Sequence, residues 1–263
     1  MKVFTLFYIL INIQEVHSWN PRLYPYDPRI HVFGNDNSFL SIHSKIAPIF
    51  TKYTDTVIYG RNLRKEVTDE EGDNKTFLDV GCGTGFSTSS NKGSLGLDTS
   101  NEMITMANNI FPNKDFEQGH IEDWKPDKKY EIVTAMFLFH EVPQFARLNI
   151  IENLKDIAKE KIIVVDIAPN YEPSKMMACG EPYIMDYLQN IRDDLVDFSE
   201  VVLQKDHVHK WTYNMKITDR FKTLDDIYDI DDVDLDSLSE EEVEYLSTWM
   251  MDIIMLLARK YLM

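Results

Sequence analysis

A glycine-rich segment directly after an apolar run constrains the fold of this chain more than any other feature. Residues 76–80 are apolar and partly β-branched, which predicts a buried strand, and the glycines Gly81, Gly83 and Gly85 follow at once. Glycines after a strand permit a tight turn and let a ligand approach the main chain with no Cβ in the way. Asp98 ends a second strand-like run, where an acidic side chain can accept hydrogen bonds from a ribose diol. This order predicts a nucleotide bound at the strand tips.

The rest of the chain alternates between strand-like and helix-like segments, which predicts an α/β fold with a mostly parallel sheet. The expected parallel strands are 76–80, 95–98, 115–118, 130–137 and 161–166. The expected helices are 38–59, 100–110 and 144–159, with a long helical region from 173 to about 198 and a polar connector at 66–75. Two late segments, 200–203 and 209–217, are expected to form a terminal antiparallel pair. Pro48 is expected to kink or split the first helix.

The composition fits a globular domain and argues against nucleic-acid binding. Of 263 residues, 44% are hydrophobic, which is enough for a sizeable core. The net charge is −17, so the chain would repel phosphate backbones. With only two cysteines, the chain is not a disulfide-framed mini-protein.

Four regions are expected along the chain. Residues 1–18 have a short charged start and an apolar stretch, which is typical of a secretory or organelle signal and favours entry into such a compartment over the cytoplasm. Residues 19–37 include three prolines within positions 20–28 and predict an extended linker. The main folded domain, which begins with a covering helix, is expected at 38–222. Residues 223–263 combine an acidic stretch, with eleven carboxylates in positions 225–244, and an amphipathic helix.

Local charge distinguishes between nucleotide classes. The glycine spacing is G-x-G-x-G, and Asp79 lies two positions before the first glycine. A carboxylate there would oppose the anionic pyrophosphate of a dinucleotide such as NAD. S-adenosylmethionine carries no phosphate, and its ammonium and sulfonium groups are favoured by a nearby carboxylate. The segment therefore predicts S-adenosylmethionine rather than NAD.

At these residues the chain resembles the class I S-adenosylmethionine-dependent methyltransferases, especially the type 11 branch that is similar to ubiquinone and menaquinone methyltransferases. The resemblance spans about residues 76–169 and is carried by the motifs at 78–85 and 95–103. It implies a Rossmann-like fold with a seven-stranded, mostly parallel sheet, an antiparallel terminal strand and helices on both faces. It also implies methyl transfer by in-line displacement.

The resemblance implies a set of cofactor-binding positions. The position of Asp98 holds the ribose hydroxyls in that family, and those of Thr99 and Met103 lie beside the adenine. In the third motif, His120 stands where an aspartate commonly contacts the adenine amino group, while Ile121 can offer its main-chain N–H. The full expected set is Asp79, Gly81, Cys82, Gly83, Gly85, Asp98, Thr99, Met103, His120, Ile121 and Met136. Cys82 fits a buried apolar side chain better than a reactive thiol.

The candidate catalytic residues are His140 and Glu141, which follow the carboxyl end of the 130–137 strand. They are expected to contact the substrate or act as a general base, and the alternative is a structural pair at the start of a helix. Asp166 ends the next strand, where structural hydrogen bonding is at least as good an interpretation. No Cys pair and no His-x-x-x-His spacing occurs, so the sequence predicts no metal site.

The sequence leaves two functions open. The first is an S-adenosylmethionine-dependent methyltransferase acting on a small-molecule acceptor, with oxygen, nitrogen and carbon acceptors all possible. The second is a non-catalytic adenosylmethionine-binding module that works through a protein partner. A membrane-dissolved acceptor is compatible with the first function, although no basic amphipathic helix supports membrane docking. The sequence does not indicate an oligomeric state.

Overall fold

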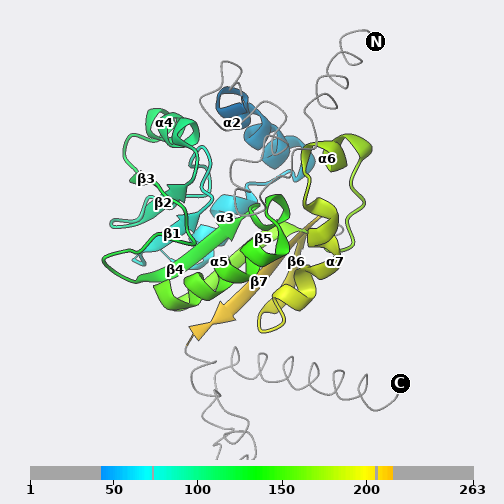
Figure 1. Ribbon diagram of the computed structural model, residues 1–263. Coiled ribbons are helices and arrows are strands. Elements are labelled where there is room, and N and C mark those ends of the chain that lie inside the picture. The colour runs from blue at the N-terminus through cyan, green and yellow to red at the C-terminus, as the bar shows by residue number, and fades with distance from the viewer. Residues whose placement is uncertain (1–42, 73, 205–206, 216–263) are drawn as a thin grey trace, which may run out of the picture.

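The computed structural model describes residues 43–72, 74–204 and 207–215, and these residues contain one seven-stranded sheet (Figure 1). The strand order is β3-β2-β1-β4-β5-β7-β6. Strands β1 to β5 pair in parallel, while β7 runs antiparallel to both β5 and β6. The sequence prediction of a mostly parallel Rossmann-like sheet with a terminal antiparallel strand is confirmed. The strands are β1 (Phe77–Val80), β2 (Leu95–Asp98), β3 (Phe116–Gln118), β4 (Tyr130–Met136), β5 (Ala158–Ile167), β6 (Ser199–Gln204) and β7 (Val208–Asn214).

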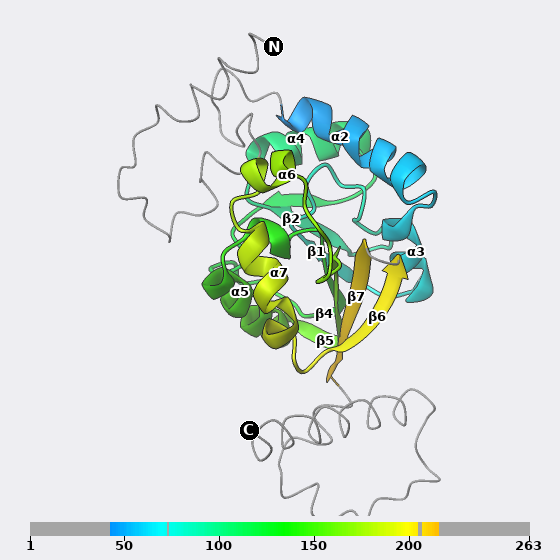
Figure 2. The same cartoon turned by 90° about the vertical axis from the view of Figure 1, so that its right-hand side faces the viewer.

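The central strands are apolar on both sides because helices cover both faces of the sheet. One cluster of buried side chains joins β1, β4 and β5 to α5 (Gln144–Ile157) and α7 (Ile184–Asp194). A second cluster joins the opposite face of the same strands to Leu63 and Val67 of α3 (Leu63–Glu70). Figure 2 shows α5 and α7 on one side of the sheet and α3 on the other.

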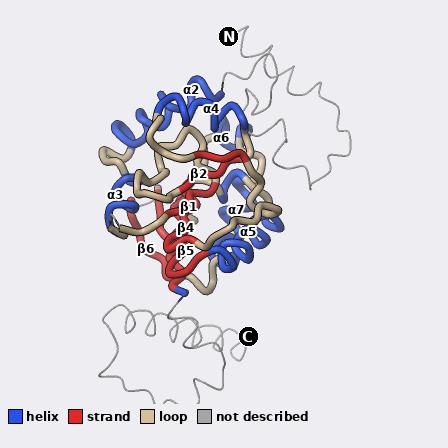
Figure 3. The backbone as a smooth tube through the Cα atoms, turned by 90° about the vertical axis from the view of Figure 1, so that its left-hand side faces the viewer, coloured by secondary structure: helices blue, strands red, loops and turns tan. Residues whose placement is uncertain are grey.

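The remaining helices gather at one end of the sheet. These are α2 (His43–Tyr53), which continues into the π-helical segment η2 (Thr54–Ile58), α4 (Asn101–Ile110) and α6 (Lys175–Gly180). Figure 3 shows α2, α4 and α6 together at this end. A short 3-10 helix, η3 (Phe139–Glu141), follows β4. Together these elements cover one end of the sheet.

Three local expectations differ from the structure. The polar stretch expected as a connector at 66–75 is helical up to Glu70, because Asn62 caps α3 by accepting a hydrogen bond from Lys65 N and the buried Leu63 and Val67 anchor it. Pro48 lies inside α2, so of the two expected outcomes, a kink or a split, the split does not occur. The long helical region from 173 to 198 is two helices, α6 and α7, separated at residues 181–183.

Several expectations fall outside the described residues. These are the signal segment 1–18, the linker 19–37, the first residues of the expected helix 38–59, and the acidic segment with its helix at 223–263. Within the described part of the chain, no helix has both the length and the apolar character needed to cross a bilayer.

Candidate functional site

A pocket of about 230 Å³ opens at the carboxyl ends of β1, β2 and β4. This is the edge of a parallel sheet where α/β folds bind their ligands. The expected site residues that line it are Gly81, Cys82, Gly83, Asp98, Thr99, Met103, His120, Ile121, Met136 and Glu141. The expected residues that do not line it are Asp79, Gly85 and His140.

The glycine turn gives the pocket a floor of bare main chain. The N–H groups of Gly81 and Cys82 both donate to Leu97 O, at 2.8 and 3.1 Å, which ties the turn to β2. Gly83 has a φ of +51°, and a Cβ built there would meet nothing within 4 Å. Because this open space belongs to the pocket, a ligand can lie directly against the Gly83 main chain.

Asp98 is the carboxylate that the pocket presents at this floor. Its Oδ2 accepts a hydrogen bond from Gly83 N at 2.8 Å, and its Oδ1 accepts one from Ser100 N at 2.9 Å. These bonds fix the carboxylate at the tip of β2. A carboxylate oxygen can accept more than one hydrogen bond, so these bonds do not prevent Asp98 from accepting from a ligand hydroxyl.

Asp79 and Gly85 lie behind the floor instead of facing the pocket. Asp79 is 1% exposed, and its carboxylate accepts hydrogen bonds from the hydroxyls of Ser87, Thr88 and Thr134 at 2.7–3.0 Å. Burial raises the pKa of Asp79, and these hydroxyl donors oppose the rise. Asp79 therefore organises the turn from below. The negative charge that the pocket itself presents at this end comes from Asp98.

Cys82 points into the protein within the turn. Its side chain is 4% exposed, and burial raises the pKa of its thiol well above the ordinary value, with the charges of Asp98 and Asp79 adding to the rise. A protonated, buried thiol is a poor nucleophile. The expectation that Cys82 behaves as a small apolar side chain agrees with this environment.

The far wall at this end comes from α4 and the segment after β3. Ser100 caps α4 by accepting a hydrogen bond from Met103 N at 3.3 Å, which confirms the expected helix start. This cap holds Met103 against the pocket. Gly119, His120 and Ile121 complete the wall.

The opposite end of the pocket lies beyond the tip of β4, at η3. Glu141 lines the pocket, while the neighbouring His140 is buried behind it with its Nδ1 2.6 Å from Asp166 Oδ1. Burial alone lowers the pKa of His140, but the charge and hydrogen bond of Asp166, together with Glu141 and Glu181, raise it to about 9. Asp166 Oδ2 also accepts hydrogen bonds from the N–H groups of Phe139 and His140. Asp166 therefore positions the whole of η3.

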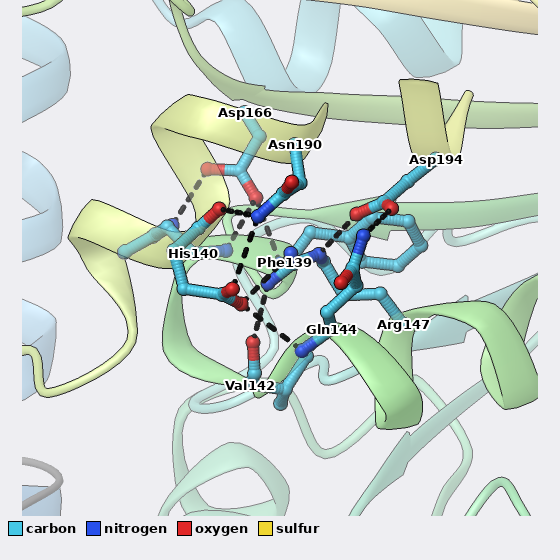
Figure 4. A network of polar contacts seen from close by, with 9 residues as sticks. Phe139, His140, Val142, Gln144, Arg147, Asp166, Asn190 and Asp194 are labelled. Atoms are coloured by element: carbon cyan, nitrogen blue, oxygen red, sulfur yellow. Dashed lines mark hydrogen bonds and ion pairs between the residues drawn. The ribbon is translucent and has the colours of Figure 1, made fainter. Parts of the chain in front are cut away.

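A buried arginine fixes this segment from the other side (Figure 4). Arg147 of α5 is fully buried and donates to Val142 O at 2.8 Å, which anchors the residue after η3. Its remaining nitrogens bind Asp194 at 2.7 Å and Asp186 at 3.0 Å, both on α7. Sequence reasoning missed this network because its members lie about 40–50 positions apart.

The cover of the pocket adds one cation that the sequence analysis also missed. Arg64 of α3 lines the pocket, pairs with the buried Asp55 and lies 4.3 Å from the ring centre of Phe137. Phe137 has a φ of 60°, stacks on Tyr59 at 6.1 Å and donates its N–H to Val165 O at 2.7 Å. The sequence signal near Arg64 is the helix cap Asn62, which marks the start of α3 but does not show that Arg64 faces a pocket.

Parts of the chain are similar to proteins that are named as methyltransferases. Residues 77–161 match the family described as methyltransferase domain. The chain is 40% identical over 70 residues to "Putative methyltransferase 235L" of Invertebrate iridescent virus 6, which covers 24% of this chain and 26% of that protein. It is 30% identical over 108 residues to trans-aconitate 2-methyltransferase of Rhizobium rhizogenes (strain K84), which covers 38% of this chain and 41% of that protein. The matched segment thus spans less than half the length of either relative.

A solved structure with a similar arrangement is a SAM-dependent methyltransferase from Aquifex aeolicus. It is 22% identical, with a TM-score of 0.45, and the similarity covers 64% of this chain and 98% of that one.

Proposed function

We propose that this chain is a class I S-adenosylmethionine-dependent methyltransferase and that it transfers the methyl group of S-adenosylmethionine to a small-molecule acceptor. The observation that carries the proposal is the pairing of a bare main-chain floor at Gly83 with the Asp98 carboxylate beside it. This floor suits a nucleoside without phosphates, because no anionic group has to be accommodated next to Asp98.

The lining residues favour one orientation of the donor. Asp98 accepts hydrogen bonds from the ribose hydroxyls, and the adenine lies between Met103 and the 119–121 segment, which line the same end. The sulfonium then lies over the glycine turn, with its methyl group toward η3 at the tip of β4. In this orientation Glu141 reaches the acceptor side of the pocket.

Methyl transfer needs alignment more than activation, because the donor is already a sulfonium. The acceptor atom forms a bond to the methyl carbon, the carbon–sulfur bond breaks, and sulfur keeps the electron pair as a neutral thioether. An N–H or O–H acceptor also gives up its proton to a base or to water. The protein contributes by holding the two reactants in line and by keeping water out. Glu141 lines the acceptor end of the pocket, and the buried His140 lies behind it.

The shape and charges of the cover support a small acceptor. Ala47 and Thr51 of α2 close over the pocket, and Arg64 places a positive charge in its wall. The name of one relative indicates a small carboxylic acid, trans-aconitate, as its acceptor. An arginine in the wall suits an acceptor of this kind, because a guanidinium can bind a carboxylate through two hydrogen bonds.

The proposal is tested by calorimetric titration of the full chain with S-adenosylmethionine, followed by transfer of a labelled methyl group to a panel of small acids, phenols and amines. We expect binding to one site per chain and labelling of at least one acceptor. No binding would refute the proposal. Binding with no labelling of any acceptor in this panel would favour the alternative, a non-catalytic module that works through a protein partner.

A further inference from the structure

Three side chains that lie far apart in the sequence meet at the acceptor end. They are His140 and Glu141 of η3 and Glu181, which begins the turn between α6 and α7, and one possible ligand atom of each lies within 4.8 Å of the others. We propose that these three residues bind a divalent transition-metal ion beside the acceptor. The role of this metal site in methyl transfer rests on the proposed function. Metal binding itself can be measured independently of that function.

The position of His140 is typical of a metal-binding histidine. Its side chain is 9% exposed, and its Nδ1 is held by Asp166 Oδ1 at 2.6 Å. Because Asp166 accepts from Nδ1–H, Nε2 is the nitrogen that can bind a metal, and binding must displace the proton that the raised pKa of His140 keeps there. Within the described part of the chain, no residue forms a hydrogen bond with Nε2. The carboxylate–histidine pair therefore presents one oriented nitrogen ligand.

The charges around the ring favour a cation. Glu141, Glu181 and Asp166 bring three carboxylates close to one imidazole. With the imidazole protonated, three carboxylates and one positive charge still leave a net negative charge around the ring, which attracts a cation. Asp166 and Arg147 anchor η3 from two sides, which holds the main chain of Glu141, and Glu181 N donates to Met177 O at 2.8 Å at the end of α6. The main chain of both glutamates is thus held near the ring.

The ligand set indicates the kind of ion. One imidazole nitrogen with two carboxylates combines a ligand preferred by Zn²⁺ and Fe²⁺ with ligands preferred by Mn²⁺ and Mg²⁺, so a transition ion such as Mn²⁺ suits it better than Ca²⁺. Three protein ligands also leave coordination positions open for water or a substrate oxygen. Because Glu141 lines the pocket, an acceptor oxygen can reach such a position. A cation there would orient the acceptor and lower its pKa.

The experiment uses Mn²⁺ and the full chain, followed by electron paramagnetic resonance. We expect one Mn²⁺ per chain with a pulsed-resonance coupling to one imidazole nitrogen. Glu181→Gln should weaken binding at least tenfold, and His140→Gln should remove the nitrogen coupling. The matched control is Glu172→Gln, which makes the same change at an exposed glutamate nearby in the sequence and should bind Mn²⁺ as the unaltered chain does.

The nitrogen coupling separates this site from the acidic stretch at 225–244, because the chain has no histidine beyond His209. No bound Mn²⁺, Mn²⁺ without nitrogen coupling, or equal binding by Glu181→Gln would each overturn the inference. Titration of the same samples with S-adenosylhomocysteine tests the donor site separately. Donor binding without metal refutes only the metal site, while metal binding without donor refutes the proposed function.

Discussion

The two ends of the pocket are built in different ways. Most of the donor end comes from one stretch, because the glycine turn, Asp98, the Ser100 cap and Met103 lie between residues 81 and 103, and only the 119–121 segment is added from outside it. The acceptor end joins residues from α2, α3, η3, β5 and the turn before α7. A site made from neighbouring residues is fixed by local geometry, whereas a site made from distant ones depends on the whole fold. The donor end should therefore respond to single local changes and the acceptor end to packing.

The largest expected effect is at the acceptor end, from Arg147→Met. This change leaves the buried Asp194, whose side chain is 2% exposed, without its ion-pair partner. Breaking a buried pair in this way costs about 3–5 kcal/mol of the free energy of unfolding. Urea unfolding followed by circular dichroism measures the loss.

A second variant makes this prediction specific to the ion pair. Arg147→Met combined with Asp194→Leu removes both charges and should recover part of the lost stability. If the double variant is less stable than the single one, Asp194 stabilises the fold through a partner other than Arg147, such as Gln144, whose side-chain amide donates to it at 2.8 Å.

The next effect is at the donor end, from Asp98→Asn. The amide can no longer accept from both Gly83 N and Ser100 N, and it loses the charge that strengthens hydrogen bonds to a ribose. We expect affinity for S-adenosylmethionine to fall about 100-fold, or about 2.7 kcal/mol, with a much smaller change in turnover at saturating donor. Calorimetry and saturation kinetics separate the two quantities. Asp127→Asn, at an exposed position, should leave both unchanged.

A smaller effect is expected from Gly83→Ala. The new methyl group would enter the pocket, and the residue would keep a left-handed φ that costs about 1 kcal/mol. Donor affinity should fall about tenfold, equivalent to about 1.4 kcal/mol. Gly60→Ala is the matched control, because Gly60 has a φ of +66° and open space around it but does not line the pocket. Equal donor affinity in the two variants would show that the main-chain floor does not contact the donor.

The smallest effect is expected from Cys82→Ala. Its buried, protonated thiol serves only as packing, so the variant should lose about 1 kcal/mol of stability and bind the donor within about threefold of the unaltered chain. Thermal unfolding and calorimetry measure these values. A loss of methyl transfer with donor binding intact would instead give the thiol a chemical role.

The difference between the ends also explains what the sequence predicted. The strand, glycine turn and Asp98 were predictable because spacing along one βα unit fixes their geometry. The role of Asp79 was less predictable, because its three hydroxyl partners lie 8, 9 and 55 positions away. Spacing alone does not show whether a carboxylate at a strand tip faces the pocket or the core.

The acceptor end was largely beyond sequence reasoning. His140 and Glu141 were identified from their place after a strand, but Glu181 comes from the interruption between two helices that the periodicity merged into one. Arg147 was part of an expected amphipathic helix, where an arginine is normally solvated. Its burial follows from Asp186 and Asp194 on α7, and no local pattern connects those positions to α5.

Phe137 has a consequence for how variants of this pocket are screened. A left-handed φ at a residue other than glycine costs about 1 kcal/mol, while its ring contacts with Tyr59 and Arg64 return a comparable amount. Replacing Phe137 with glycine would remove both contributions and also the burial of its ring against the core cluster on which it packs. Melting temperature would then report relieved backbone strain and lost packing together. Sorting a library by ligand selectivity, and not by thermal stability alone, would separate the loss of the aromatic pocket wall from these effects.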